Sequence, residues 1–393
     1  MPIGFIFIMV LNGLCLPNSD EGIRMYLRGE TNGVVPDPYK KLADGQMWAD
    51  ACGQIFFSLG VVMGIMTSYS SYNRRNKPII RDVMAISFGN CGCSFFSGFA
   101  VFSIVGYLQW LDSPVASKTS SSSLAFVAFP AAAETMNGSN FWAGILGLTL
   151  FMLGIDSAFS MVEAISTVIY DTEWGMQIPR KLTALIVCSS GFLFSLLFCF
   201  SWGYTYFDVV DRYIAVYLMF ILGMGECFGA AWMFGRDELA VGSDKIPVMI
   251  ISITYWVANI FCGILTVFVL GRCPDIEKDP ESFDPLELCL TDIPAYWGVI
   301  IFWLIIVCAM LASFLLMKKH DFGHWYRNVF LYGAYQLAME VVKRSDEAME
   351  IEGQWWAHPF ILWWGFSIKY FVPWALWTLM MWNFRIDITP SKD

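Results

Sequence analysis

Charged residues are scarce in this sequence: only 15% of the 393 residues are Asp, Glu, Lys or Arg. A water-soluble protein of this length carries far more surface charge, so the composition nearly excludes a soluble enzyme. Histidine is scarcer still, with three residues, all between positions 318 and 358. We find neither a nucleophile with a base nor a metal cluster, and therefore expect no enzyme. The net charge of -10 shows no basic excess, so we expect no nucleic-acid partner.

Apolar residues are abundant instead, at 57% of the chain. A run of about 20 apolar residues can cross a bilayer as a helix. Such runs predict eight spans, at 51–73, 83–111, 141–170, 182–207, 213–234, 247–271, 296–317 and 359–384. The shorter run Gly4–Leu16 lacks the basic flank and cleavage site of a signal peptide, and we interpret it as the stump of a truncated helix. We therefore predict an all-α, multi-pass integral membrane protein in a lipid bilayer.

Lysine and arginine gather in the links at 74–81, 180–181 and 318–327. Short cytoplasmic loops retain these residues, so we place the three links on the cytoplasmic side and the opposing loops, including 17–47, outside. Cys273 and Cys289 share one predicted external loop, where they could form a disulfide or stay free.

Small polar residues interrupt two of the apolar runs at helical spacing. Gln54 and Ser58 are four residues apart, as are Asn90 and Ser94, so each pair lies on one face of its helix. Polar side chains within hydrocarbon are costly and commonly mark an ion or substrate path. Asp156 is a sharper signal, because a carboxylate among apolar residues needs a cation, a proton or a hydrogen bond to another helix.

Several segments together resemble one known family, the neurotransmitter:sodium symporters. Trp48–Gly60 and Ser70–Asn73 are similar to its sixth transmembrane helix, Asn90–Phe99 to the seventh, Leu153–Ser157 to the eighth and Ala125–Pro130 to the loop between those two. The resemblance covers roughly residues 5–238. It implies part of the inverted-repeat fold of the bacterial leucine transporter type, with a sixth helix broken midway, where Gly60 would supply backbone freedom.

The activity implied by this resemblance is secondary active transport at the plasma membrane, with sodium and chloride gradients driving uptake of a small amino acid or related amine. The implied chloride ligands are Gln54, Ser58, Asn90 and Ser94. Amide and hydroxyl groups suit chloride because they donate hydrogen bonds without a fixed positive charge. Chloride-independent bacterial relatives have a carboxylate in this neighbourhood, and these four positions have none.

The resemblance also implies two sodium sites, which suit oxygen ligands because sodium is a hard cation. Ser58 and Asn90 would serve the first site. Asp156, Ser157 and the backbone carbonyl of Leu153 would form the second.

The implied substrate-binding residues are Phe57, Gly60, Ser160 and Met161. Val62 and Met63 depart from the family, which usually has Gly and often an aromatic residue at these positions, and this leaves the substrate's identity open. The implied gates involve Asp211 outside, Asp171 inside, and Tyr72 as the aromatic residue near the inner gate.

The largest departure is that nothing here resembles helices one to four of the family. We expect a truncated sequence, an incomplete gene prediction, or half of a split transporter whose missing helices come from a separate chain. A non-transporting membrane scaffold or regulatory subunit is the alternative, because alternating access requires one repeat to move against the other.

We divide the chain into four parts. These are a symporter core (1–238, from the end of helix five to helix ten), an inserted transmembrane hairpin (239–317), a cytoplasmic amphipathic segment (318–356), and a final transmembrane helix with tail (357–393). Helix eleven is then the last span, 359–384. Alternatively helix eleven is 248–270, and the last span is an addition.

Overall fold

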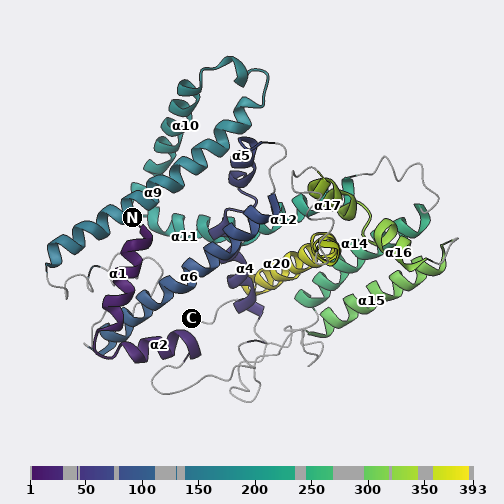
Figure 1. Ribbon diagram of the computed structural model, residues 1–393, viewed down its shortest axis with the longest axis horizontal. Coiled ribbons are helices and arrows are strands. Elements are labelled where there is room, and N and C mark those ends of the chain that lie inside the picture. The colour runs from purple at the N-terminus through teal and green to yellow at the C-terminus, as the bar shows by residue number, and fades with distance from the viewer. Residues whose placement is uncertain are drawn as a thin grey trace. The chain divides into compact units, whose positions relative to one another are not determined.

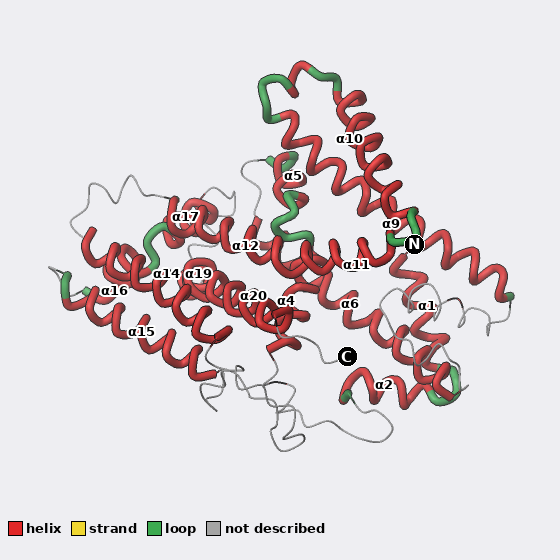
Figure 2. Tube along the Cα trace, turned by 180° about the vertical axis from the view of Figure 1, so that it is seen from behind, coloured by secondary structure: helices red, strands yellow, loops and turns green. Residues whose placement is uncertain are grey.

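The computed structural model describes residues 2–29, 42, 45–74, 79–110, 130, 138–234, 245–268, 296–317, 321–343 and 357–388. The regular structure of this part of the chain is helical (Figure 1, Figure 2). The predicted all-α architecture is confirmed. Cys273, Cys289 and residues 125–129 lie outside the described residues.

The described chain forms two compact units, which are treated separately below. The first comprises Met1–Ala43, Gly64–Ser71 and Ile80–Leu197, and the second comprises Asp44–Met63, Tyr72–Ile79 and Phe198–Asp393.

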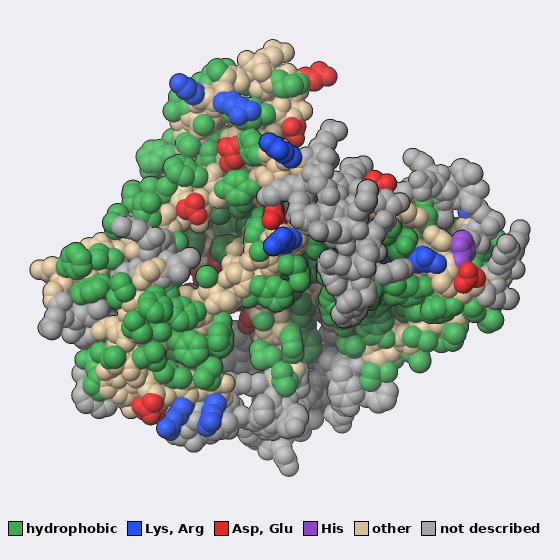
Figure 3. Space-filling view, viewed as in Figure 1, with side chains coloured by type: hydrophobic (Ala, Val, Ile, Leu, Met, Phe, Trp, Pro, Cys, Tyr) green, Lys and Arg blue, Asp and Glu red, His purple; other side chains and the backbone are tan. Residues whose placement is uncertain are grey.

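The first unit is built on three helices, α1 (Pro2–Leu14), α6 (Ile79–Trp110) and α9 (Ser139–Tyr170). Their apolar side chains form a small core in which Met9 and Val10 of α1 meet Ala100 and Ile104 of α6 and Leu146 of α9. A fourth helix, α10 (Arg180–Ser195), packs against α9. Most of its residues remain exposed within the unit, as expected for a helix that faces lipid. Hydrophobic side chains are correspondingly widespread on the face in Figure 3.

One helix of the first unit falls in the loop predicted at 17–47. This helix, α2 (Ser19–Arg28), crosses α6 at very close range. A Cβ added to Gly22 or Gly106 would collide with the backbone of the other helix. Glycine allows this backbone approach, and the Asn18 amide adds a hydrogen bond to the Gly106 carbonyl at 3.3 Å. The loop predicted at 17–47 therefore contains a helix, which the search for apolar runs did not indicate because α2 is polar.

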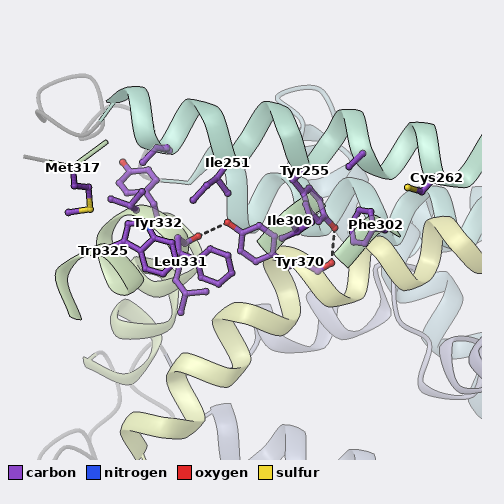
Figure 4. Close-up of a cluster of buried hydrophobic side chains, with 14 residues drawn as sticks. Ile251, Tyr255, Cys262, Phe302, Ile306, Met317, Trp325, Leu331, Tyr332 and Tyr370 are labelled. Atoms are coloured by element: carbon purple, nitrogen blue, oxygen red, sulfur yellow. Dashed lines mark hydrogen bonds between the residues drawn. The ribbon is translucent and has the colours of Figure 1, made fainter. Parts of the chain in front are cut away.

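The second unit has its largest core between α14 (Lys245–Phe268), α15 (Tyr296–Leu315) and the C-terminal helices (Figure 4). The C-terminal helices run as α19 (Ala357–Phe366), a π-helical turn η8 (Ser367–Phe371) and α20 (Val372–Ile388). A smaller core joins α20 to α12 (Met219–Phe228) and α4 (Gly45–Leu59).

Five of the eight predicted spans are apolar helices of membrane length within the described residues: 79–108, 139–170, 180–199, 245–265 and 298–315. The predicted span 51–73 is divided into α4 and α5 (Ile65–Ser71). The spans predicted at 213–234 and 359–384 are helical but contain π-helical turns, namely η4 (Ile214–Leu218), η5 (Gly229–Met233) and η8. Apolar composition marks a span but not such irregularities, which depend on how the backbone packs.

The boundary between two predicted spans was misplaced. The span predicted at 182–207 ends as the 3-10 turn η3 (Leu196–Cys199), and a new helix, α11 (Gly203–Tyr213), begins four residues later. It continues through η4 into α12, so this helical run begins ten residues before the predicted start at Tyr213. The reason is that the turn at 200–202 consists of Phe, Ser and Trp, which do not interrupt an apolar run.

The segment predicted to be cytoplasmic and amphipathic contains α16 (Phe322–Trp325), the π-turn η7 (Tyr326–Phe330) and α17 (Ala334–Lys343). The α17 helix is amphipathic, since Ala334 and Ala338 are buried while Glu340 is exposed. Trp325 and Phe330, however, belong to the large core of the second unit. These two residues are therefore buried in the second unit.

Candidate functional site

The most distinctive backbone feature of the predicted site is the interruption between α4 and α5. Gly60, Val62 and Gly64 adopt left-handed conformations, with φ of 62°, 61° and 74°. Gly60 thus has the backbone conformation expected of it, which glycine adopts without steric cost. Val62 is an outlier, because a β-branched residue is rarely found at positive φ. A helix broken in this way leaves backbone N–H and C=O groups free to meet ligands.

In the second unit, α4 presents the predicted polar residues on the side away from its packing partners. Cys52 and Phe56 pack toward α12 and α20. Gln54 follows Cys52 by two residues, and Ser58 follows Phe56 by two. Two residues correspond to about 200° of rotation around the helix, so Gln54 and Ser58 point to the opposite side, where both are exposed within the unit. Phe57 is exposed beside them. The predicted amide of Gln54 and hydroxyl of Ser58 therefore lie on the same exposed side of α4.

In the first unit, α9 carries the predicted second sodium site and part of the substrate site on a single face. Leu153, Asp156, Ser157, Ser160 and Met161 recur at spacings of three and four residues along this helix. All are exposed within the unit except Ser160, which is half-buried. The carboxylate and hydroxyl oxygens on this face are of the type that sodium prefers.

The second half of the broken helix docks on this same face of α9, one turn beyond Asp156. The Tyr69 hydroxyl of α5 lies 2.6 Å from Oγ of Ser160, and Ser160 in turn donates to the Asp156 carbonyl at 3.0 Å. Oγ of Ser68 is 2.8 Å from Oγ1 of Thr167. Packing of α5 against α9 thus fixes the orientation of a predicted substrate-binding hydroxyl.

Tyr69 is a site residue that sequence reasoning missed. It precedes the motif Ser70–Asn73 and lies three residues before the predicted gate residue Tyr72, which is a helical spacing in the sequence. That spacing was the only available signal, because its partner Ser160 is 91 residues away in the chain.

The other predicted residues occupy the following positions. Asn90 is half-buried and Ser94 exposed on α6 of the first unit. Asp171 caps the C-terminal end of α9 and is exposed. Beside it the Tyr170 hydroxyl donates to the Arg180 carbonyl at 3.1 Å, and the Arg180 guanidinium lies 5.3 Å from the Tyr170 ring.

Two predicted gate residues belong to the second unit. Tyr72 follows α5 directly and is exposed. Asp211 is exposed in the last turn of α11, inside a helical run that continues to Met233, and not at a helix start as its predicted place before Tyr213 implied. Residues of the predicted chloride site and of the first sodium site belong to both units, and these sites stay predictions.

A family profile and several curated proteins are similar to this chain. The profile described as "Sodium:neurotransmitter symporter family" matches residues 1–321. The chain belongs to the sodium:neurotransmitter symporter family. This match extends beyond the resemblance found over residues 5–238 and includes α14 and α15. Family membership and the membrane-length helices identify the chain as a multi-pass membrane protein.

Three similar curated proteins carry transporter names. The sodium- and chloride-dependent taurine transporter of Rattus norvegicus is 35% identical over 253 residues, which are 62% of this chain and 39% of that protein. The sodium-dependent serotonin transporter of Drosophila melanogaster is 33% identical over 284 residues, 69% of this chain and 43% of that protein. The sodium- and chloride-dependent creatine transporter 1 of Bos taurus is 29% identical over 322 residues, which are 79% of this chain and 48% of that protein. The chain thus spans less than half the length of these relatives.

Proposed function

We propose that this symporter-family chain supplies the ion- and substrate-binding part of a transporter that couples sodium and chloride gradients to the uptake of a small amino acid or related amine. The single observation that carries the proposal is the interrupted helix, whose second half orients Ser160 one turn from Asp156. The names of the relatives support the coupling ions, since the taurine and creatine transporters are called sodium- and chloride-dependent.

The proposed residue roles follow the chemistry of the side chains. Asp156, Ser157 and the Leu153 carbonyl would coordinate one sodium ion, and Ser58 with Asn90 the other. Chloride would be held by donors from Gln54, Ser58, Asn90 and Ser94. Phe57, Gly60, Ser160 and Met161 would contact substrate, with Asp211, Asp171 and Tyr72 at the gates. Sodium then compensates the carboxylate of Asp156, which would be costly to keep charged in hydrocarbon on its own.

A separate chain that supplies helices one to four belongs to the same proposal. Such a chain would contribute the half of the inverted repeat against which this chain moves.

Ligand binding by the purified full chain tests the proposal. Radiolabelled taurine, creatine, serotonin and glycine would be offered in sodium chloride, choline chloride and sodium gluconate, to the chain alone and to the chain co-expressed with the first half of the taurine transporter. Retention of one ligand that requires both sodium and chloride is the expected result. Failure of every ligand in both preparations would overturn the proposal and favour a non-transporting scaffold.

A further inference from the structure

A buried lysine in the second unit lies outside every site described so far. Lys369, in the π-turn η8, is 1% exposed. Its Nζ donates to the Tyr332 carbonyl at 2.7 Å and lies 4.6 Å from the centre of a Trp232 ring and 5.5 Å from that of Tyr370. Within the described part of the chain, no carboxylate is among its contacts.

The π-helical turns η5, η7 and η8 contribute residues that pack around this lysine and its neighbour Tyr370. A π-turn displaces the helical hydrogen bonds and frees backbone carbonyls, and here side chains bind them. Tyr255 donates to the Tyr370 carbonyl at 2.7 Å, and Tyr370 donates to the Phe330 carbonyl at 2.6 Å (Figure 4). Trp232 donates to the Lys369 carbonyl at 3.3 Å. The backbone carbonyls of Lys369 and of its neighbour Tyr370 therefore each accept a hydrogen bond from another helical segment.

A cavity of about 750 Å³ lies beside η5 and η8, within the second unit. Its lining is mainly apolar and aromatic, and includes Trp232, Met249, Ile253 and Trp256. Lys369 and Lys245, the exposed first residue of α14, also line it. A volume of this size lies within the range of small-molecule sites. Its lining combines an apolar surface for an acyl chain with two lysine residues, of which Lys245 is exposed and Lys369 is buried.

We infer that this cavity binds an anionic phospholipid, with the headgroup phosphate or carboxylate at Lys369 and Lys245 and an acyl chain along the apolar lining. A buried ammonium is costly unless it is compensated. One carbonyl and two aromatic faces compensate Lys369 only in part, because its ammonium has three donors. The surrounding bilayer supplies the anion that completes the pairing. This site is independent of the proposed transport function and needs no coupling ion.

Native mass spectrometry of the purified full chain tests the inference. Phosphatidylserine and phosphatidylcholine with identical acyl chains would be titrated in detergent against wild type, Lys369→Gln and Lys245→Gln. Lys181→Gln is the matched control, since Lys181 is an exposed lysine of the first unit. We expect wild type to prefer phosphatidylserine by at least about tenfold, the usual scale of one charged hydrogen bond. Lys369→Gln should lose most of this preference, Lys245→Gln part of it, and Lys181→Gln none.

A second variant keeps the test decisive if Lys369→Gln fails to fold. Ser252→Trp adds bulk to the cavity while retaining both lysines. It should lower phosphatidylserine binding at least fivefold without creating a preference for phosphatidylcholine. Equal binding of the two lipids by wild type would overturn the inference. So would an unchanged preference in both Lys369→Gln and Ser252→Trp. Free oleate that binds as tightly as phosphatidylserine, with the same dependence on Lys369, would overturn the assignment to a phospholipid.

Discussion

The left-handed conformation of Val62 predicts an unusual response to glycine in the interruption between α4 and α5. Val61 and Val62 are adjacent residues of the same type, both half-buried, but only Val62 has a positive φ, at 61°. A residue with a Cβ costs about 1–2 kcal/mol in this conformation. Glycine elsewhere costs about 0.5–1 kcal/mol relative to alanine, through the entropy of the unfolded chain.

The comparison that isolates this strain is alanine against glycine at each position, because the valine packing is lost in both variants. At residue 62 the relief of strain exceeds the entropy cost, so Val62→Gly should be more stable than Val62→Ala by about 0.5–1 kcal/mol. At residue 61 the order should reverse, with Val61→Gly less stable than Val61→Ala by a similar amount.

Unfolding of the purified chain by SDS in mixed micelles, followed by far-UV circular dichroism, would measure the four free energies. The decisive quantity is the sign of the alanine-to-glycine difference at each position. The same sign at both positions would refute the left-handed conformation at Val62, whatever the absolute stabilities.

Three further predictions concern ion coupling and packing. Asp156→Asn should abolish the sodium dependence of ligand binding, because the amide keeps the shape but removes the charge that sodium compensates; binding across a sodium titration measures this. Ser94→Glu should weaken chloride dependence, because a fixed carboxylate replaces the anion; binding in gluconate against chloride measures this. Tyr255→Phe should lower the free energy of unfolding by about 0.6–1.7 kcal/mol, the range for hydrogen bonds between membrane helices, since its 2.7 Å bond to the Tyr370 carbonyl is buried; SDS titration measures this.

Each of these predictions has a matched control. Glu173→Gln removes an exposed acid outside the proposed ion sites and should leave sodium dependence intact. Ser190→Glu places a carboxylate on α10 and should leave chloride dependence intact. Tyr204→Phe removes a hydroxyl from a side chain that is 69% exposed and should leave stability unchanged. An effect of any control equal to that of its partner variant would contradict the corresponding role.

Much of the fold could be predicted because apolar length is a local property. Runs such as 141–170 and 296–317 are helices with nearly the predicted bounds. Two features were missed because apolar runs do not reveal them. The helix α2 is polar, and the turn that separates α10 from α11 lies within an apolar run. Both depend on close backbone contacts, as between Gly22 and Gly106.

For the candidate site, the residues that share a face of α9 could be predicted, but the contact between α9 and α5 could not. The spacing of Asp156, Ser157 and Ser160 places them on one face whatever surrounds α9, because helical periodicity fixes this. The contact of Ser160 with Tyr69 was not predictable, because these residues are 91 positions apart in the chain and meet only through the packing of α5 on α9.

The sequence alone determined that this chain is a helical membrane protein and which polar side chains share a helix face, since bilayer thickness and helical periodicity act on neighbouring residues. Only the tertiary structure decided that Tyr69 orients Ser160 and that the π-turns enclose Lys369 beside an apolar cavity. These contacts join residues far apart in the chain, and they depend on packing between helices rather than on local pattern.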